Sequence, residues 1–159
     1  MKKILEILFC LFLISCSNNS DKINELQNAI DSLQLKIADS YKPGLGEFMS
    51  RIQIHHAKLW FAGTNENWAL ADFEIQEIKE SFEDIEKYQA EREETKTLPI
   101  IFAPLDSVQL AINIKSLTDF KQCFYRLTNT CNACHKAVKY EFNKVKIPDS
   151  PPFSNQVFK

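Results

Sequence analysis

The chain contains little glycine and proline, with 3 Gly and 6 Pro among 159 residues. So few of these residues cannot supply the glycine-rich loops that bind phosphates or the many tight turns of a β-sandwich or barrel. A basic block is also lacking, because 19 Lys and Arg are scattered among 21 Asp and Glu and the net charge is −2. This charge argues against nucleic-acid binding. The composition predicts an ordered, all-α protein with glycine and proline at its helix boundaries.

Residues 1–15 are predicted to be a lipoprotein signal peptide. Lys2 and Lys3 precede an apolar run over positions 4–14 that only Glu6 interrupts, and a membrane-spanning helix takes about 20 apolar residues. The run ends in Leu13-Ile14-Ser15-Cys16, which resembles a bacterial lipobox, in which the cysteine is lipidated. We therefore expect Cys16 to anchor the exported chain to a membrane. A plain signal peptide and a buried helix are the alternatives.

Residues 16–42 are predicted to form a lipid-anchored tether with a short helical or coiled-coil stalk. Apolar side chains recur there at alternating intervals of three and four, at Ile23, Leu26, Ile30, Leu33 and Ile37. Isoleucine and leucine in these alternating positions favour a parallel pair of helices. A homodimer through residues 23–37 is therefore one prediction. These five residues form the seam of a coiled coil, and a coiled coil this short has marginal stability in water. A helix that folds back on its own domain and a frayed stalk therefore stay open as alternatives.

Four helical segments are predicted within the next domain, residues 43–147. They cover about 46–62, 65–93, 105–114 and 117–142. Gly63 is expected to stop the first segment, Asn65 to cap the second, and Ser116 to open a capping box before the fourth. Short connections between four helices are typical of an antiparallel four-helix bundle. A proline-rich tail, 148–159, follows.

The second segment has the clearest helical pattern. Its apolar residues are spaced at intervals of four and three, at Ala71, Ile75, Ile78, Phe82 and Ile85. The linker that holds Pro99 and ends at Pro104 is expected to separate this helix from the third. Strand-like alternation never lasts long enough to compete with these patterns.

The last predicted helix carries the sequence Cys131-Asn132-Ala133-Cys134-His135. This C-x-x-C-H pattern is the attachment signature of c-type haem, in which two thiols bond the porphyrin vinyl groups and the histidine binds the iron. On a helix the two thiols lie one turn apart on the same side. Three alternatives stay open: a disulfide oxidoreductase, a plain disulfide, and a zinc site with Cys123, His55 or His56 as a further ligand.

A four-helix bundle with C-x-x-C-H near the end of its last helix resembles the class II c-type cytochromes, the cytochrome c-prime group. The resemblance covers about residues 44–142 and implies one covalent haem c, held by Cys131 and Cys134 with His135 as proximal axial ligand. Low-spin members of that group use a methionine near the start of the first helix as sixth ligand, and Met49 occupies that position.

Elimination within the mature chain also leads to Met49, since Met1 leaves with the signal peptide. His56 lies on the same helical face at i+7, about 10 Å farther along the axis. We therefore predict Met49 as the distal axial ligand and His56 as a haem-edge residue or alternative distal ligand. Trp60 and Trp68 are expected to serve packing.

These observations predict a membrane-anchored monohaem c-type cytochrome that transfers single electrons and is not an enzyme. It is expected to face the periplasm, at the outer membrane in preference to the inner one in a Gram-negative cell, and to meet an unidentified redox partner protein. A gas-binding, gas-sensing or weakly peroxidatic haem protein with an open or labile sixth position is the first alternative. A zinc-binding or structural lipoprotein without haem is the second.

Overall fold

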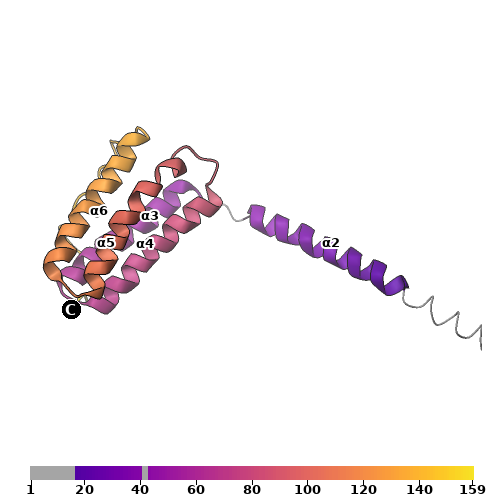
Figure 1. The fold of residues 1–159 in the computed structure, drawn as a ribbon, viewed down its shortest axis with the longest axis horizontal. Coiled ribbons are helices and arrows are strands. Elements are labelled where there is room, and N and C mark those ends of the chain that lie inside the picture. Colours follow the sequence, from indigo (N-terminus) through magenta and orange to yellow (C-terminus); the bar gives the residue numbers. More distant parts are fainter. Residues whose placement is uncertain (1–16, 41–42) are drawn as a thin grey trace, which may run out of the picture. The chain divides into compact units, whose positions relative to one another are not determined.

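A computed structural model describes residues 17–40 and 43–159 of the chain. These residues divide into two compact units, one ending at residue 42 and one spanning 43–159. The described residues form five α-helices, one short 3₁₀ helix and no strand (Figure 1). The elements are α2 (Ser17–Ser40), α3 (Leu45–Thr64), α4 (Trp68–Tyr88), η1 (Thr95–Thr97), α5 (Pro99–Asn113) and α6 (Leu117–Ala137).

The predicted signal peptide and the lipidation site Cys16 lie outside the described residues. Within them, no helix has the length and apolar character needed to cross a membrane. Helix α2 confirms the helical segment that the seam predicted. The five seam side chains, from Ile23 to Ile37, are between 47% and 68% exposed. Their pairing with a second copy of the chain stays a prediction.

Helices α3 to α6 pack side by side around one apolar core (Figure 1). The more extensive contacts are those of α3 with α4, α4 with α5, α5 with α6, and α3 with α6. The predicted all-α class is therefore confirmed for the described residues, in an arrangement compatible with a helical bundle.

Helix α4 buries all five apolar residues of the pattern predicted for the second segment, from Ala71 to Ile85, which we call the α4 seam. Its cap differs from the prediction, because Asn67 and not Asn65 accepts a hydrogen bond from the Leu70 N–H, at 3.2 Å. The helix also ends at Tyr88, earlier than expected. The segment that follows it folds on itself through turns and η1, and the Thr95 hydroxyl donates to the Gln89 carbonyl at 2.7 Å.

Gly63 lies inside α3, which continues to Thr64, so the prediction that Gly63 stops this helix is wrong. The chain reverses instead at Glu66, which has a φ of 58°. Gly63 serves packing: a Cβ atom there would lie 2.1 Å from Cζ of the Phe120 ring. The absence of a side chain lets α6 bring that ring against α3.

Helix α5 begins at Pro99, whereas the prediction began it near Leu105. A proline in the first turn costs little, because the N–H that it lacks has no partner within a helix. Pro104 lies inside the helix, where it removes one hydrogen bond without ending it. Two prolines within six residues predict a linker, and the burial of Ile101 and Leu105 overrides that local signal.

Helix α6 begins as predicted, with the Ser116 hydroxyl accepting from the Asp119 N–H at 3.3 Å. It ends at Ala137, short of the predicted Phe142. The tail is not helical, and its Phe158 is buried with its ring 5.8 Å from that of Phe61.

Candidate functional site

The motif residues Cys131, Cys134 and His135 lie on the last turns of α6. Cys134 is buried, and Cys131 is half-buried and packs against the core. Cys134 also makes a weak contact of 3.9 Å between its Sγ and the Thr97 carbonyl oxygen. Cys123, two turns earlier, packs against the same core. All three cysteines in the described part of the chain are free thiols.

The environment of the two motif thiols keeps them protonated. Burial, reinforced by the neighbouring Cys134, raises the pKa of Cys131 to about 12. Burial also raises the pKa of Cys134. Disulfide oxidoreductases need the opposite shift, because the thiolate is the reactive form. The thiols therefore do not resemble those of a redox-active C-x-x-C site.

His135 is held by the segment that follows α6. Its Nδ1 lies 2.6 Å from the backbone oxygen of Asn143. A carbonyl oxygen only accepts hydrogen bonds, so Nδ1 must donate the proton. In the neutral imidazole this leaves the lone pair on Nε2, the form that binds a metal. The tautomer of His135 is thus set by a backbone contact.

Two adjoining cavities surround these residues. The first has a volume of about 190 Å³ and the second of about 310 Å³. They share six lining residues: Gly46, Met49, Leu98, Cys134, His135 and Asn143. Sites for small molecules and cofactors span roughly 300–1,000 Å³. The two volumes together are in that range.

All five predicted cofactor-binding residues line the first cavity: Met49, His56, Cys131, Cys134 and His135. The first two come from α3 and the other three from α6. Residues far apart in the sequence are thus brought to one place. Met49 lines both cavities and is half-buried, so its thioether is accessible from the cavity.

His56 is a buried, hydrogen-bonded side chain. Its Nε2 lies 2.9 Å from the Thr128 hydroxyl, which donates its own proton to the Phe124 carbonyl at 3.0 Å. Nε2 must therefore be the donor in the first contact. Burial lowers the pKa of His56 to about 4, so the ring is neutral at pH 7. With Nε2 occupied by Thr128, His56 is less suited than Met49 to bind an iron.

Several polar residues around the cavities were not predicted from the sequence. Asn132, inside the C-x-x-C-H motif, hydrogen-bonds the backbone of Val145. At the second cavity, Glu94 pairs with Arg92 at 2.7 Å and accepts from the Tyr140 hydroxyl at 2.9 Å. The hydrogen bond from Arg92 is the main cause that lowers the pKa of Glu94 to about 2. The contacts of Asn132 with Val145 and of Tyr140 with Glu94 join residues 13 and 46 positions apart, so no local pattern could have revealed them.

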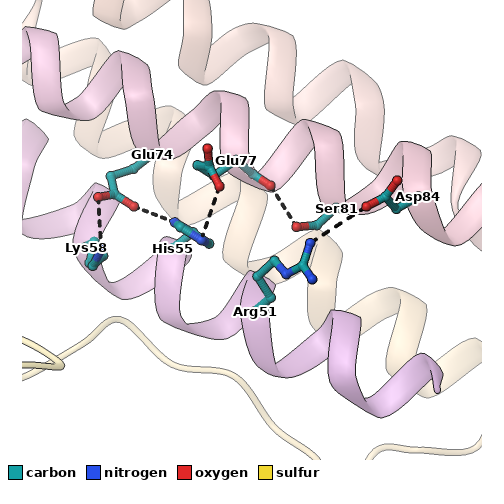
Figure 2. Close-up of polar contacts among 7 residues, drawn as sticks. All are labelled: Arg51, His55, Lys58, Glu74, Glu77, Ser81 and Asp84. Atoms are coloured by element: carbon teal, nitrogen blue, oxygen red, sulfur yellow. Dashed lines mark hydrogen bonds and ion pairs between the residues drawn. The ribbon is translucent and has the colours of Figure 1, made fainter. Parts of the chain in front are cut away.

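A second polar cluster joins α3 to α4 (Figure 2). Glu74 is fully buried, and one of its oxygens lies 2.6 Å from Nδ1 of His55 while the other lies 3.5 Å from Nζ of Lys58. The Nε2 of His55 is also 3.7 Å from Glu77. Glu74 was not singled out from the sequence, yet its spacing of three from Ala71 and four from Ile78 puts it beside the buried apolar residues of α4. That spacing is the signal that could have found it.

The residues around the first cavity fit a c-type haem. Two thiols one turn apart, an imidazole with a free Nε2 and a thioether form the donor set for covalent attachment and axial ligation. In the part of the chain that the structure describes, no three His, Cys, Asp or Glu side chains group closely enough to hold a metal ion by themselves. A zinc site of that kind finds no support there.

No known protein family matches the chain, and neither a curated protein nor a solved structure matches it.

Proposed function

We propose that this protein is a lipid-anchored, monohaem c-type cytochrome that transfers single electrons. The observation that supports this most strongly is the first cavity, where α6 contributes Cys131, Cys134 and His135 and α3 contributes Met49. In this proposal the two cysteines hold the haem by thioether bonds. His135 would be the proximal ligand of its iron and Met49 the distal one.

The order of contacts between α3 and α6 supports an antiparallel bundle of the class II cytochrome type. His56 contacts Thr128, Trp60 contacts Phe124, and Gly63 adjoins Phe120. Residue numbers thus rise along α3 while they fall along α6. In such a pair the start of α3 lies beside the end of α6, as the resemblance to the cytochrome c-prime group requires.

Each side chain of the site has a distinct task in this proposal. His135 presents Nε2 as a ligand because the Asn143 carbonyl occupies Nδ1. Met49 supplies a soft thioether. His56 stays neutral and bonded to Thr128, so it adds no charge to the cavity. With His135 and Met49 as its ligands, a bound haem would supply one-electron transfer at a raised potential.

The proposal extends to the membrane through the lipobox and α2. Lipidation of Cys16 would place the attachment point directly before α2, which begins at Ser17. The cytochrome unit would then act at the periplasmic face of a membrane and meet a redox partner protein there.

Covalent haem is tested by producing the chain in a bacterial periplasm with haem-maturation enzymes. After denaturing electrophoresis, a haem peroxidase stain should mark the wild type, because thioether bonds survive denaturation. The double variant Cys131→Ala/Cys134→Ala should not stain. Cys123→Ala, which removes a thiol from the same helix but outside the motif, should stain like the wild type. A colourless wild type would instead favour a zinc-binding or structural lipoprotein.

The distal ligand is tested by absorption spectra of the haem-loaded chain. Met49→Ala should convert a low-spin into a high-spin spectrum, while His56→Gln, which retains a donor for Thr128, should stay low-spin. Loss of the low-spin spectrum only on changing His56 would assign that residue as the ligand. A high-spin wild type that binds carbon monoxide or nitric oxide would favour the gas-binding or peroxidatic alternative.

The anchor and the homodimer are tested separately from the haem. Labelled palmitate should be incorporated into the wild type but not into Cys16→Ser. For the unlipidated chain, sedimentation should report a dimer that Ile30→Asp converts into a monomer, with Asn28→Asp on the opposite face as control. A wild type that sediments as a monomer would remove the dimer from the proposal.

A further inference from the structure

After α6 the chain turns back across the end of that helix. Lys139 has a φ of 63°, and the N–H of Tyr140 donates to the His135 carbonyl at 2.7 Å. We call residues 139–147, which begin at this reversal, the strap. Strap residues 143–145 line the first cavity. The strap is therefore one wall of the candidate site.

Asn132 attaches the strap to the motif. Its Nδ2 donates to the Val145 carbonyl at 2.9 Å, and its Oδ1 accepts from the Val145 N–H at 2.8 Å. Two bonds from one amide group to the backbone of one residue fix both the distance and the orientation of the strap. Aspartate at this position would accept but not donate, and alanine would do neither. The contact spans 13 residues, so it holds the strap in place and does not close a local turn.

Val145, where Asn132 holds the strap, is two residues after Asn143, whose backbone oxygen contacts His135. The Asn143 oxygen accepts from Nδ1 of His135 at 2.6 Å, and the Asn143 N–H donates to the Tyr140 carbonyl at 2.9 Å. When one N–H of a metal-binding imidazole donates a hydrogen bond, the other nitrogen becomes a stronger electron-pair donor to the metal and the orientation of the ring is fixed. The position of the Asn143 carbonyl therefore controls how His135 acts as a ligand.

We propose that Asn132 is a positioning residue for the iron ligand His135. It clamps the strap through Val145, so that the Asn143 carbonyl accepts the Nδ1 hydrogen bond. This inference rests on the proposed function and deepens it, because stronger donation from Nε2 stabilises ferric over ferrous iron and lowers the midpoint potential. A variable position of the C-x-x-C-H motif thereby tunes the potential.

The test measures the midpoint potential of the haem-loaded protein by spectroelectrochemical titration. Asn132→Ala should raise the potential, because the strap no longer holds the acceptor for His135. Asn132→Asp, which keeps the bond from the Val145 N–H, should raise it less. The direction is informative: a strap that merely opened the site to water would stabilise the more highly charged ferric state and lower the potential.

Asp149→Asn is the matched control. It removes the ion pair between Lys146, near the end of the strap, and Asp149, just beyond it; this contact is exposed and does not involve His135 or Asn132. The potential of this variant should equal that of the wild type. An equal rise in the Asp149 and Asn132 variants would overturn the proposal, because any loosening of this part of the chain would then have the same effect.

A second measurement needs only the wild type and keeps the proposal falsifiable if the Asn132 variants do not fold. The Nδ1 proton of His135 should give an NMR resonance that exchanges slowly with water. Rapid exchange would overturn the proposal, as would an Asn132→Ala protein that binds haem at the wild-type potential. Haem content, measured as the pyridine haemochrome, distinguishes failure of the proposed function from failure of this inference. If the wild type binds no haem, the proposed function itself fails.

Discussion

Helices α3 and α6 contact each other along two stretches that are filled in different ways. At the packed end, made by Trp60, Gly63, Phe120 and Phe124, three aromatic rings lie with centroids 5.0 to 6.4 Å apart. At the hollow end, made by Met49, His56, Cys131, Cys134 and His135, a cavity of about 190 Å³ separates the side chains. The two ends belong to the same helices and share one core.

The contrast follows the sequence of α6. Its apolar face continues without interruption from Phe120 through Phe124 and Leu127 to Cys131 and Cys134, at helical spacing. Large rings fill one half of this face and small thiols the other. Because protein interiors are close-packed, a cavity along such a face is the usual candidate for a ligand site. A porphyrin is itself a large flat ring, and in the proposed function it would fill the hollow end as the aromatic side chains fill the packed end.

The largest expected difference in stability between the two ends comes from removing an aromatic ring at the packed end. In the haem-free chain, Phe120→Ala should lower the free energy of unfolding by about 3–5 kcal/mol, since Phe120 is fully buried and the rings around it cannot collapse into the space. Met49→Ala at the hollow end should cost less than half as much, because that side chain is half-buried and faces a void already present. Urea unfolding followed by circular dichroism measures both. Equal losses would contradict the distinction between the two ends.

Only part of the contrast between the packed end and the hollow end could be predicted from the sequence. The α4 seam, the Ser116 cap and the helical placement of C-x-x-C-H follow from patterns within a few turns, and the structure has all three. The choice of Asn67 over Asn65 as a cap depends on the turn after α3, where the Asn67 N–H donates to the Ala62 carbonyl. That contact has no signature in the spacing of residues.

The parts of the site that escaped prediction depend on backbone atoms or on distant contacts. The acceptor for His135 is the carbonyl of Asn143, which any residue at that position would supply. The clamp between Asn132 and Val145 spans a helix end whose location was predicted too late in the chain. Had α6 continued to Phe142, no strap could have reached the motif. An error of one helical turn in a boundary thus concealed the contacts that orient the proposed ligand.

The next largest effect concerns pH and the hollow end. His56 has a pKa of about 4 in the folded chain against 6.5 when free, so between these values the unfolded state binds more protons. Stability is therefore complete above pH 6.5 and falls as the pH drops toward 4, by about 3 kcal/mol at 1.36 kcal/mol per pKa unit.

This pH effect is measured as the difference between two haem-free chains. The free energy of unfolding of the wild type should fall more steeply from pH 7 to pH 4 than that of His56→Gln, which keeps a donor for Thr128 but does not titrate. The comparison removes the contribution of the carboxylates, which both chains share. Parallel pH profiles would mean that water enters the hollow end far enough to solvate a charged His56.

The smallest effect compares one glycine at each end of α3. A Cβ on Gly63 would lie 2.1 Å from the Phe120 ring, whereas a Cβ on Gly46 has no atom within 4 Å. Neither glycine has a positive φ, so alanine suits the backbone at both. Gly63→Ala should lower the free energy of unfolding by about 1–3 kcal/mol through overpacking, and Gly46→Ala should raise it by up to about 1 kcal/mol through helix propensity. Thermal unfolding of the two haem-free variants measures the difference, and a Gly63→Ala chain as stable as Gly46→Ala would show that the packed end has room for a methyl group after all.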